Sequence, residues 1–230
     1  MVYHLMVHHW PNDSKIRDVA HSATAIIEGM STTHHFTVFD TAIGHCGIAW
    51  GAHGIVAVQL PGDDAGRTRA RLLRRCSDVT EAAPPAGIQQ VIDAIVTLLG
   101  GTHVDLSAAP LDMARVDEFG ARVYAIARQI PPGQTLTYGE IATRLGDRLL
   151  AQDVGQALGR NPFPIIVPCH RVLAAGGKAG GFSAPGGVNT KLRLLAIEGA
   201  PLPKSSTRSL RIKEAAASYK AAQLGLFDGA

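Results

Sequence analysis

The segment 161–172 constrains this chain more than any other part, because three of its twelve residues are prolines that restrict the backbone to extended or turn conformations. An apolar run through the segment ends at Cys169, which is followed by His170. The cysteine therefore lies at the end of a rigid, buried approach. An adjacent imidazole can take the thiol proton through a water in a tight turn, which favours a thiolate nucleophile. Taken alone, the pair also fits a buried structural cysteine beside a hydrogen-bonded histidine.

Size and composition allow a packed core. The chain has 230 residues, of which 46% are hydrophobic and 18% charged, enough for one large domain or two small ones. Its three cysteines cannot all pair and no apolar run is long enough to span a membrane, so we expect a cytoplasmic protein without membrane contact. Residues 1–200 carry 17 Lys and Arg against 17 Asp and Glu, so the net charge of +3 comes from the tail. Overall basicity therefore says little about a nucleic-acid partner.

The first half of the chain predicts a small α+β unit over residues 30–112. Short apolar or alternating runs separated by glycines are typical of an antiparallel meander. A helix is expected over 64–76, and we interpret its five arginines as a solvated face. Another helix is expected over 87–99, and residues 103–106 look like a further short strand. The runs that predict the meander cover residues 36–40, 46–50 and 55–60.

The second half, residues 113–200, predicts an all-helical unit. A helix over 116–130 is stopped by two prolines and a glycine. Thr137 and Glu140 have the spacing of a capping box and start the next helix. A glycine turn then leads to a helix over 148–159, and two short helices across such a turn are typical of a helix-turn-helix.

The helix expected over 148–159 has two distinct faces. Its apolar residues share one face and should lie in the core. Small residues form a stripe on another face, and because glycine costs up to about 1 kcal/mol of helix stability relative to alanine, the stripe indicates a close approach. That approach is to a neighbouring helix or to a nucleic-acid groove. The apolar face holds Leu150, Val154, Ala157 and Leu158, and the stripe holds Ala151, Gly155 and Gly159.

A family resemblance rests on three features of this half. They are Asn161-Pro162, the block Pro-Cys-His-Arg-Val from Pro168 to Val172, and Glu198 after a glycine-rich loop. Together they resemble the O6-alkylguanine-DNA alkyltransferases, the bacterial type of methylated-DNA–protein-cysteine methyltransferases. The resemblance is strong over 116–200 and diffuse over 35–112. It implies a ribonuclease H-like scaffold in the first half and direct repair of O6-alkylguanine and O4-alkylthymine in DNA.

By this resemblance, Cys169 receives the alkyl group irreversibly, so that each molecule acts once. A relay is expected from Glu198 to His170 and through a water to the thiol, as an acid orients histidine in other nucleophile-activating triads. Asn161 is expected to brace the turn that carries the cysteine. We expect no cofactor, and no metal ion either, because no cysteine or carboxylate spacing completes a ligand set around His4, His8 and His9.

The resemblance also implies a DNA-facing surface on the two short helices, because the target base must be flipped out of the duplex. Tyr138 falls where the family has a tyrosine that presses on the phosphate beside the target nucleotide. Gln152 falls where the family has an arginine that fills the vacated stack. Asp153 follows where a small residue is usual, so we expect weaker or altered DNA binding. The same surface includes Ala151, Gly155 and Arg160.

A base pocket is implied next to the cysteine. Backbone carbonyls of Cys169 and Val172 would accept from the exocyclic amine of guanine, and the amide of Ser183 with the loop at Phe182 would address O6. The family usually has a tyrosine in place of Phe182. Transfer should be slower here if that hydroxyl donates to O6, and little changed if the backbone does so. Leu158 and Pro164 would form an apolar wall.

The two ends of the chain lie outside the resemblance. Residues 1–29 are expected to form a mobile extension, and residues 201–230 a basic tail. A pentapeptide in the tail resembles the motif by which bacterial repair proteins bind the sliding clamp. The alternative is that its apolar side chains fold back on the body. The motif residues are Gln223, Leu224, Leu226 and Phe227.

The predicted function is therefore alkyl transfer by a nucleoid-associated monomer whose partner is double-stranded DNA with an alkylated guanine. One alternative is a sensor that binds alkylated DNA with weak or no transfer; Gln152 and Asp153 favour it, and Cys169 speaks against it. A second alternative is a thiol enzyme acting on a small molecule, which the helix-turn-helix and the lack of a cofactor loop disfavour.

Overall fold

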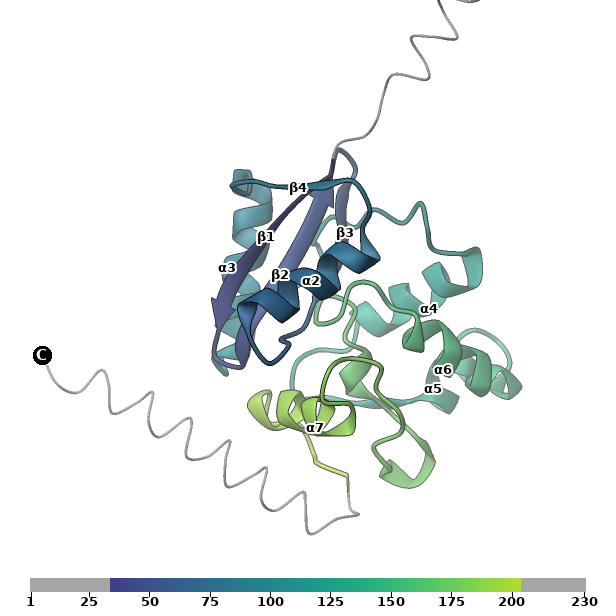
Figure 1. Ribbon diagram of the computed structural model, residues 1–230. Helices are drawn as coiled ribbons and strands as arrows, with labels where there is room; N and C mark the ends of the chain where they lie inside the picture. The colour runs from purple at the N-terminus through teal and green to yellow at the C-terminus, as the bar shows by residue number, and fades with distance from the viewer. Residues whose placement is uncertain (1–33, 204–230) are drawn as a thin grey trace, which may run out of the picture. The chain divides into compact units, whose positions relative to one another are not determined.

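Three antiparallel strands begin the part of the chain that the computed structural model describes, residues 34–203 (Figure 1). The strands β1 (His34–Thr41), β2 (Gly44–Gly51) and β3 (Gly54–Gln59) form the meander that the sequence predicts. A fourth strand, β4 (Val79–Glu81), is not predicted; it pairs in parallel with β1 and gives the sheet order β3-β2-β1-β4. The expected extension 1–29 and the clamp motif lie outside the described residues.

Helices cover both faces of this sheet (Figure 1). They are α2 (Ala65–Arg75) and α3 (Ala86–Leu99), close to the bounds that the sequence predicts. Because side chains alternate along a strand, Ala49 of β2 packs with Leu72 of α2, whereas Ile48 packs in the larger cluster that contains the buried face of α3. The sheet is thus buried between two helices, and α2 lies on the face away from α3.

The strand expected at residues 103–106 is wrong, since the backbone there is irregular. Hydrogen bonds from side chains to backbone carbonyls position this region, in place of the backbone pairing expected of a strand. His103 Nε2 lies 2.9 Å from the carbonyl oxygen of Glu198, and Arg128 donates to the carbonyls of Ser107 and Ala109. Farther along, the chain pairs with the edge of the sheet at one isolated bridge, between Leu111 and Ile55 of β3, where the amide of Ile55 donates to the carbonyl of Pro110 at 2.9 Å.

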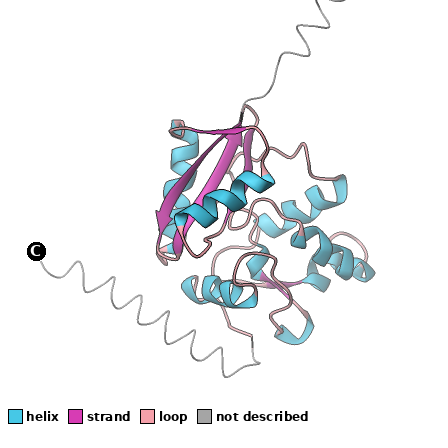
Figure 2. Cartoon of the chain, in the orientation of Figure 1, coloured by secondary structure: helices cyan, strands magenta, loops and turns pink. Residues whose placement is uncertain are grey.

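Four helices dominate the second half (Figure 2). They are α4 (Glu118–Arg128), α5 (Tyr138–Arg144), α6 (Ala151–Gly159) and α7 (Val188–Ile197). The predicted capping box is present, with Thr137 and Glu140 exchanging side-chain and backbone hydrogen bonds at the start of α5. The single helix expected over 148–159 instead begins with a 3-10 turn, η1 (Arg148–Leu150). The Asp147 side chain accepts from the amide of Leu149 at 2.8 Å and fixes this tighter turn.

The prediction of an all-helical second half is wrong, because two short strands lie within it. Strand β5 (Leu136–Thr137) pairs in parallel with β6 (Val172–Leu173). Two more 3-10 turns, η2 (Cys169–Arg171) and η3 (Ala175–Gly177), flank β6. Because α5 starts directly after β5, this short pairing holds Tyr138 close to the segment that follows Cys169.

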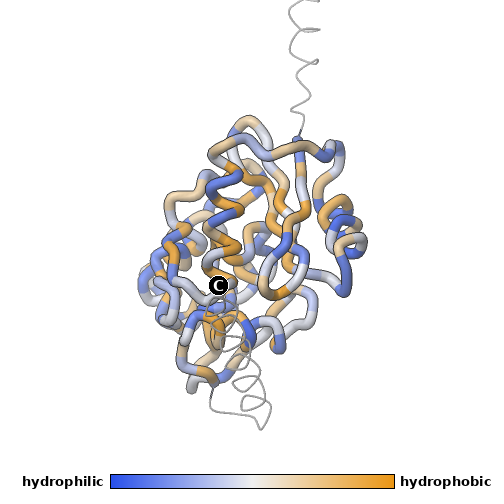
Figure 3. Tube along the Cα trace, turned by 90° about the vertical axis from the view of Figure 1, so that its left-hand side faces the viewer, coloured by the Kyte–Doolittle hydropathy of each residue, from blue (hydrophilic) through white to orange (hydrophobic). Residues whose placement is uncertain are grey.

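One hydrophobic cluster runs through both halves, and the hydrophobic stretches of the chain gather in the interior (Figure 3). As predicted for the second short helix, Val154, Ala157 and Leu158 are buried, while Leu150 is half-buried. The amide of Val58 donates to the carbonyl of Pro162 at 2.8 Å, which ties the proline-rich segment to β3. None of the helices within residues 34–203 has the length and apolar character needed to cross a membrane.

Candidate active site

The turn that carries Cys169 is built around the side chain of Asn161. Its Oδ1 accepts from the amide of Phe163 at 2.9 Å, and its Nδ2 donates to the carbonyl of Val167 at 2.8 Å. Between them Ile165 has a φ of 76°, which a β-branched residue rarely adopts. The two hydrogen bonds of Asn161 stabilise this strained turn and so fix the position of Cys169.

The thiol of Cys169 is 8% exposed and receives a hydrogen bond from Asn161 Nδ2, 3.4 Å from Sγ. Burial raises the pKa of the Cys169 thiol, and the Asn161 hydrogen bond and the charge of Lys191 partly oppose the rise. The thiol is therefore protonated at rest, and a base must remove its proton when it reacts.

His170, the predicted base, is paired with a buried carboxylate. Its Nε2 lies 2.9 Å from Glu198 Oε1, and both side chains are buried. A carboxylate only accepts, so Nε2 carries the hydrogen and Nδ1 of the neutral ring is an acceptor. Burial lowers the pKa of His170 although Glu198 opposes this, which keeps the ring neutral. Nδ1 has no hydrogen-bond partner among the described residues and is free to accept a proton.

Arg171 completes this group and was missed by sequence reasoning. Its Nε donates to Glu198 Oε2 and its Nη2 to Oε1, both at 2.8 Å, a bidentate pair with both residues buried. Burial alone would raise the pKa of Glu198, but its bonds to His170 and Arg171 outweigh this and lower the pKa to about 2. Glu198 is thus a fixed negative charge. The arginine directly after Cys-His was the available signal.

Lys191 of α7 is a second buried cation that sequence reasoning missed. It is fully buried, and its Nζ donates to the carbonyl of Val172 at 2.6 Å. The same Nζ lies 5.8 Å from the centroid of the Tyr138 ring. Burial lowers the pKa of Lys191 to about 8, and ionisation of Cys169 to the thiolate would oppose this. The signal in the sequence was a lysine four residues before the buried Leu195, on the inner face of the helix.

Two cavities meet at Cys169, and most of the predicted site residues line one or both. The cavity beside α6 has a volume of about 570 Å³, and the other, which reaches α2, about 310 Å³. Cys169, Phe182 and Ser183 line both of them. The α6 cavity also holds Tyr138, Ala151, Gln152, Gly155 and Leu158, and the α2 cavity holds Asn161 and Pro164.

Three of the residues that the sequence predicts for the base pocket and the DNA-facing surface lie outside both cavities. Val172 is fully buried, and its carbonyl already accepts from Lys191. Arg160 faces α4, where its Nη2 is 3.7 Å from Asp117 Oδ2. Asp153 lines the same groove as Arg160, away from Gln152. Asp153 is thus not a lining residue of the α6 cavity, and its repulsion of DNA phosphates, like a DNA contact by Arg160, stays a prediction.

Comparisons with known proteins agree with this geometry. The model of a family described as "6-O-methylguanine DNA methyltransferase, DNA binding domain" matches residues 118–200. A methylated-DNA–protein-cysteine methyltransferase of Methanothermobacter thermautotrophicus is 37% identical over 156 residues, 68% of this chain and 80% of the relative. One of Mycobacterium tuberculosis is 33% identical over 176 residues, 75% of this chain and 97% of the relative.

Solved structures of similar proteins agree with these sequence relatives. A crystal structure of Mycobacterium tuberculosis OGT in complex with DNA has a TM-score of 0.59 to this chain at 30% identity, and the match covers 77% of this chain and 98% of that one. The mixed α+β fold and a buried cysteine with a histidine–glutamate pair define a class of cysteine-based transferases. Within it, this chain belongs to the methylated-DNA–protein-cysteine methyltransferase family, which confirms the family predicted from the sequence.

Proposed function

We propose that this protein repairs DNA directly, by a single transfer of the alkyl group of O6-alkylguanine to Cys169. The observation that carries the proposal is a nearly buried thiol in the wall shared by two cavities, next to the paired His170 and Glu198. Sγ attacks the alkyl carbon in one displacement. The sulfur–carbon bond forms as the carbon–O6 bond breaks, and the guanine leaves with the electron pair and takes up a proton. O4-alkylthymine would react in the same way.

Removal of the thiol proton is assigned to His170. Its Nδ1 accepts the proton through one water, and Glu198 keeps the hydrogen on Nε2 and stabilises the imidazolium that forms. Asn161 and Lys191 stabilise the thiolate. The thioether product has no leaving group that water could displace, so each molecule acts once.

The base and its strand are assigned to the α6 cavity. In this proposal α5 and α6 are a helix-turn-helix, Tyr138 presses on the backbone at the flipped nucleotide, and Gln152 enters the vacated stack. Phe182 and Ser183 address O6 from the loop that lines both cavities. The Val172 carbonyl can still accept from the guanine amine with its second lone pair, since Lys191 uses only one.

Exposure to a duplex that carries O6-methylguanine tests the function. Intact mass spectrometry should show one permanent methyl gain per molecule, and peptide mapping should place it on Cys169. An unmodified duplex of the same sequence is the control. A protein that binds the lesion but gains no mass would support the alternative, an alkyl-lesion sensor with weak or no transfer. The observation that favours this alternative is the uncharged Gln152 at the position where the family has an arginine.

Replacing Gln152 by arginine should tighten binding to duplex DNA, because a cation on the α6 cavity displaces one more counterion from the phosphates. The log–log slope of affinity against salt concentration should steepen by about 0.9. A salt titration by fluorescence anisotropy measures it. Gln156→Arg is the matched control, since Gln156 is exposed on the same helix but lines the groove beside α4. Equal affinities and slopes for wild type and Gln152→Arg would contradict the assignment.

Four finer inferences complete the proposal. The sheet half, residues 30–112, is a ribonuclease H-like scaffold, and residues 113–200 form the DNA-binding and transfer domain. The protein works as a monomer associated with the nucleoid. The pentapeptide that begins at Gln223 is a docking motif for the sliding clamp. This last inference rests on the sequence alone, because the motif lies outside the described residues.

A further inference from the structure

The five arginines of α2 are exposed or half-buried, as their interpretation as a solvated face predicts, and they fall into two groups. Arg67 pairs with Asp63 at 2.7 Å, and Arg69 pairs with Glu81 at 3.2 Å. The other three have no carboxylate within ion-pair distance among residues 34–203. These three, Arg71, Arg74 and Arg75, are the arginines that line the cavity ending at Cys169.

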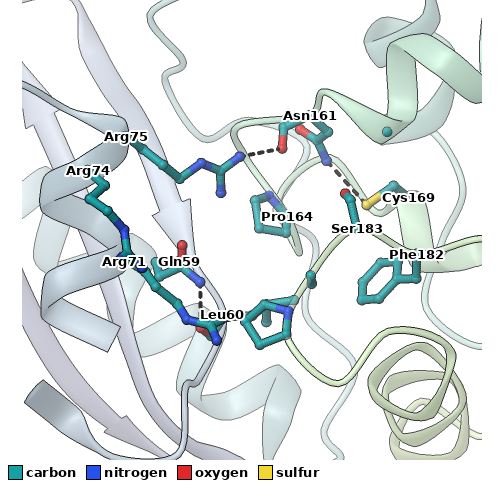
Figure 4. Close-up of a pocket in the computed structure, with 13 residues that line it drawn as sticks. Gln59, Leu60, Arg71, Arg74, Arg75, Asn161, Pro164, Cys169, Phe182 and Ser183 are labelled. Carbon is teal, nitrogen blue, oxygen red and sulfur yellow. Dashed lines mark hydrogen bonds between the residues drawn. The ribbon is translucent and has the colours of Figure 1, made fainter. Parts of the chain in front are cut away.

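Figure 4 shows this cavity with the three α2 side chains on one wall and Cys169, Ser183 and Phe182 on the other. None of the residues that line it is acidic. Its guanidinium wall is therefore a concave cationic surface without a protein counter-charge, which favours an anionic group. Pro164 and Phe182 provide apolar surface near the thiol.

Arg75 links the three α2 arginines to the turn that carries Cys169. Its Nη2 lies 3.4 Å from the carbonyl oxygen of Asn161, the residue whose Nδ2 contacts Cys169 Sγ (Figure 4). The cationic wall and the thiol are thus joined through one residue. Arg71 and Arg74 make no such link and are available to a ligand.

The volume of the cavity points to a ligand larger than a methyl group. The base is assigned to the α6 cavity, and a methyl group on O6 would need only the immediate surroundings of Sγ. The additional 310 Å³ on the α2 side begins at that sulfur and ends at the arginines. A long substituent on the reacting carbon would pass along Pro164 and Phe182 and reach the guanidinium groups with its far end.

We propose that the α2 cavity receives the arm of a bulky O6-alkyl group and selects arms that end in a carboxylate. This inference rests on the proposed function and names a substrate class for it. The bonds made and broken are unchanged: sulfur bonds to the carbon next to O6, the carbon–O6 bond breaks, and the carboxylate takes no part. A contact of the same arginines with the DNA backbone is the competing assignment. It is less favoured, because the arginines line a concavity that ends at the thiol and not the α6 cavity.

Two free-base probes of matched shape test the proposal without DNA: O6-(4-carboxybenzyl)guanine and its neutral isostere O6-(4-carbamoylbenzyl)guanine. Transfer rates are read by intact mass. The wild-type protein should react faster with the carboxylate arm, by about fivefold for partly exposed charge pairs. In the double variant Arg71→Gln, Arg74→Gln this ratio should fall to about one while the rate with the neutral arm is kept. Arg67→Gln, on the same helix but paired with Asp63, should keep the wild-type ratio.

The transfer rate with the neutral probe is the control for folding, since a misfolded variant would lose its rates with both probes. An unchanged ratio in the double variant, or a faster neutral arm in the wild type, would overturn the proposal. Equal loss of both rates in a folded double variant, with weaker binding to undamaged duplex, would assign the arginines to the DNA backbone and overturn it as well. Absence of any adduct in the wild type, with O6-benzylguanine included, would refute the proposed function itself and this inference with it.

Discussion

Replacing Cys169 by alanine is expected to abolish alkyl transfer completely while the protein remains folded. The thiol is the reacting group, and neither of the other two cysteines can take its place. Cys46 is fully buried, and burial raises the pKa of its thiol to about 12. Burial also raises the pKa of Cys76, which packs beneath α2. Both are therefore protonated and enclosed.

Intact mass after incubation with O6-benzylguanine and with a lesion-bearing duplex measures this result. Cys46→Ala and Cys76→Ala are the matched controls, and each should still gain one alkyl group. Binding of the duplex by Cys169→Ala should persist, because the α6 cavity keeps its other walls. An adduct on Cys46 or Cys76 in the Cys169→Ala variant would contradict the assignment of the nucleophile.

Replacing Glu198 by glutamine is expected to reduce both stability and transfer. The change leaves the buried guanidinium of Arg171 without its bidentate carboxylate, which typically costs about 3–5 kcal/mol of unfolding free energy. Glu81→Gln is the matched control, since it removes an exposed pair with Arg69 and should cost less than about 1 kcal/mol. Urea unfolding measures both, and equal losses would show that the buried pair contributes no more than the exposed one.

The stabilisation by Glu198 has a defined pH dependence. Its pKa is lowered on folding from 4.5 to about 2, so the folded state favours the ionised form. Its contribution is therefore fully present above pH 4.5 and is lost as the pH falls toward 2. The Glu198→Gln variant should lose this part of the acid sensitivity and approach the stability of the wild type at low pH.

The positioning role of Glu198 can be separated from its structural role by the pH dependence of transfer. Without the carboxylate, no full negative charge lies opposite Nε2 to stabilise the imidazolium that forms on His170, and the rate at neutral pH should fall about 10²-fold or more. Raising the pH should restore much of this loss, because direct ionisation of the thiol replaces the relay. A variant that was only partly unfolded would show no such recovery.

Local features of this site could be predicted from the sequence, whereas its long-range contacts could not. The capping box of Thr137 and Glu140 depends on residues three positions apart, and the turn at Asn161 depends on nearby prolines, so both are readable. Strand β4 is only three residues long and owes its conformation to pairing with β1. Its short run Val-Thr-Glu carries no periodic signal.

The arginines of α2 illustrate the same limit. Their spacing along the helix is visible in the sequence, but which of them meet a carboxylate depends on Asp63 and Glu81, and which face Cys169 depends on how the two halves pack. Lys191 is similar, since its burial follows from the carbonyl of Val172 and the ring of Tyr138, both distant in the chain. Burial of such charges is decided by tertiary packing.

The position of Glu198, 28 residues after its partner His170, has a consequence for synthesis of the protein. In a growing chain, Cys169 and His170 are added before α7 and the glutamate. Until then nothing holds the imidazole in the tautomer that accepts a proton. The relay is therefore complete only when α7 docks, so that a molecule still lacking this helix does not consume its cysteine.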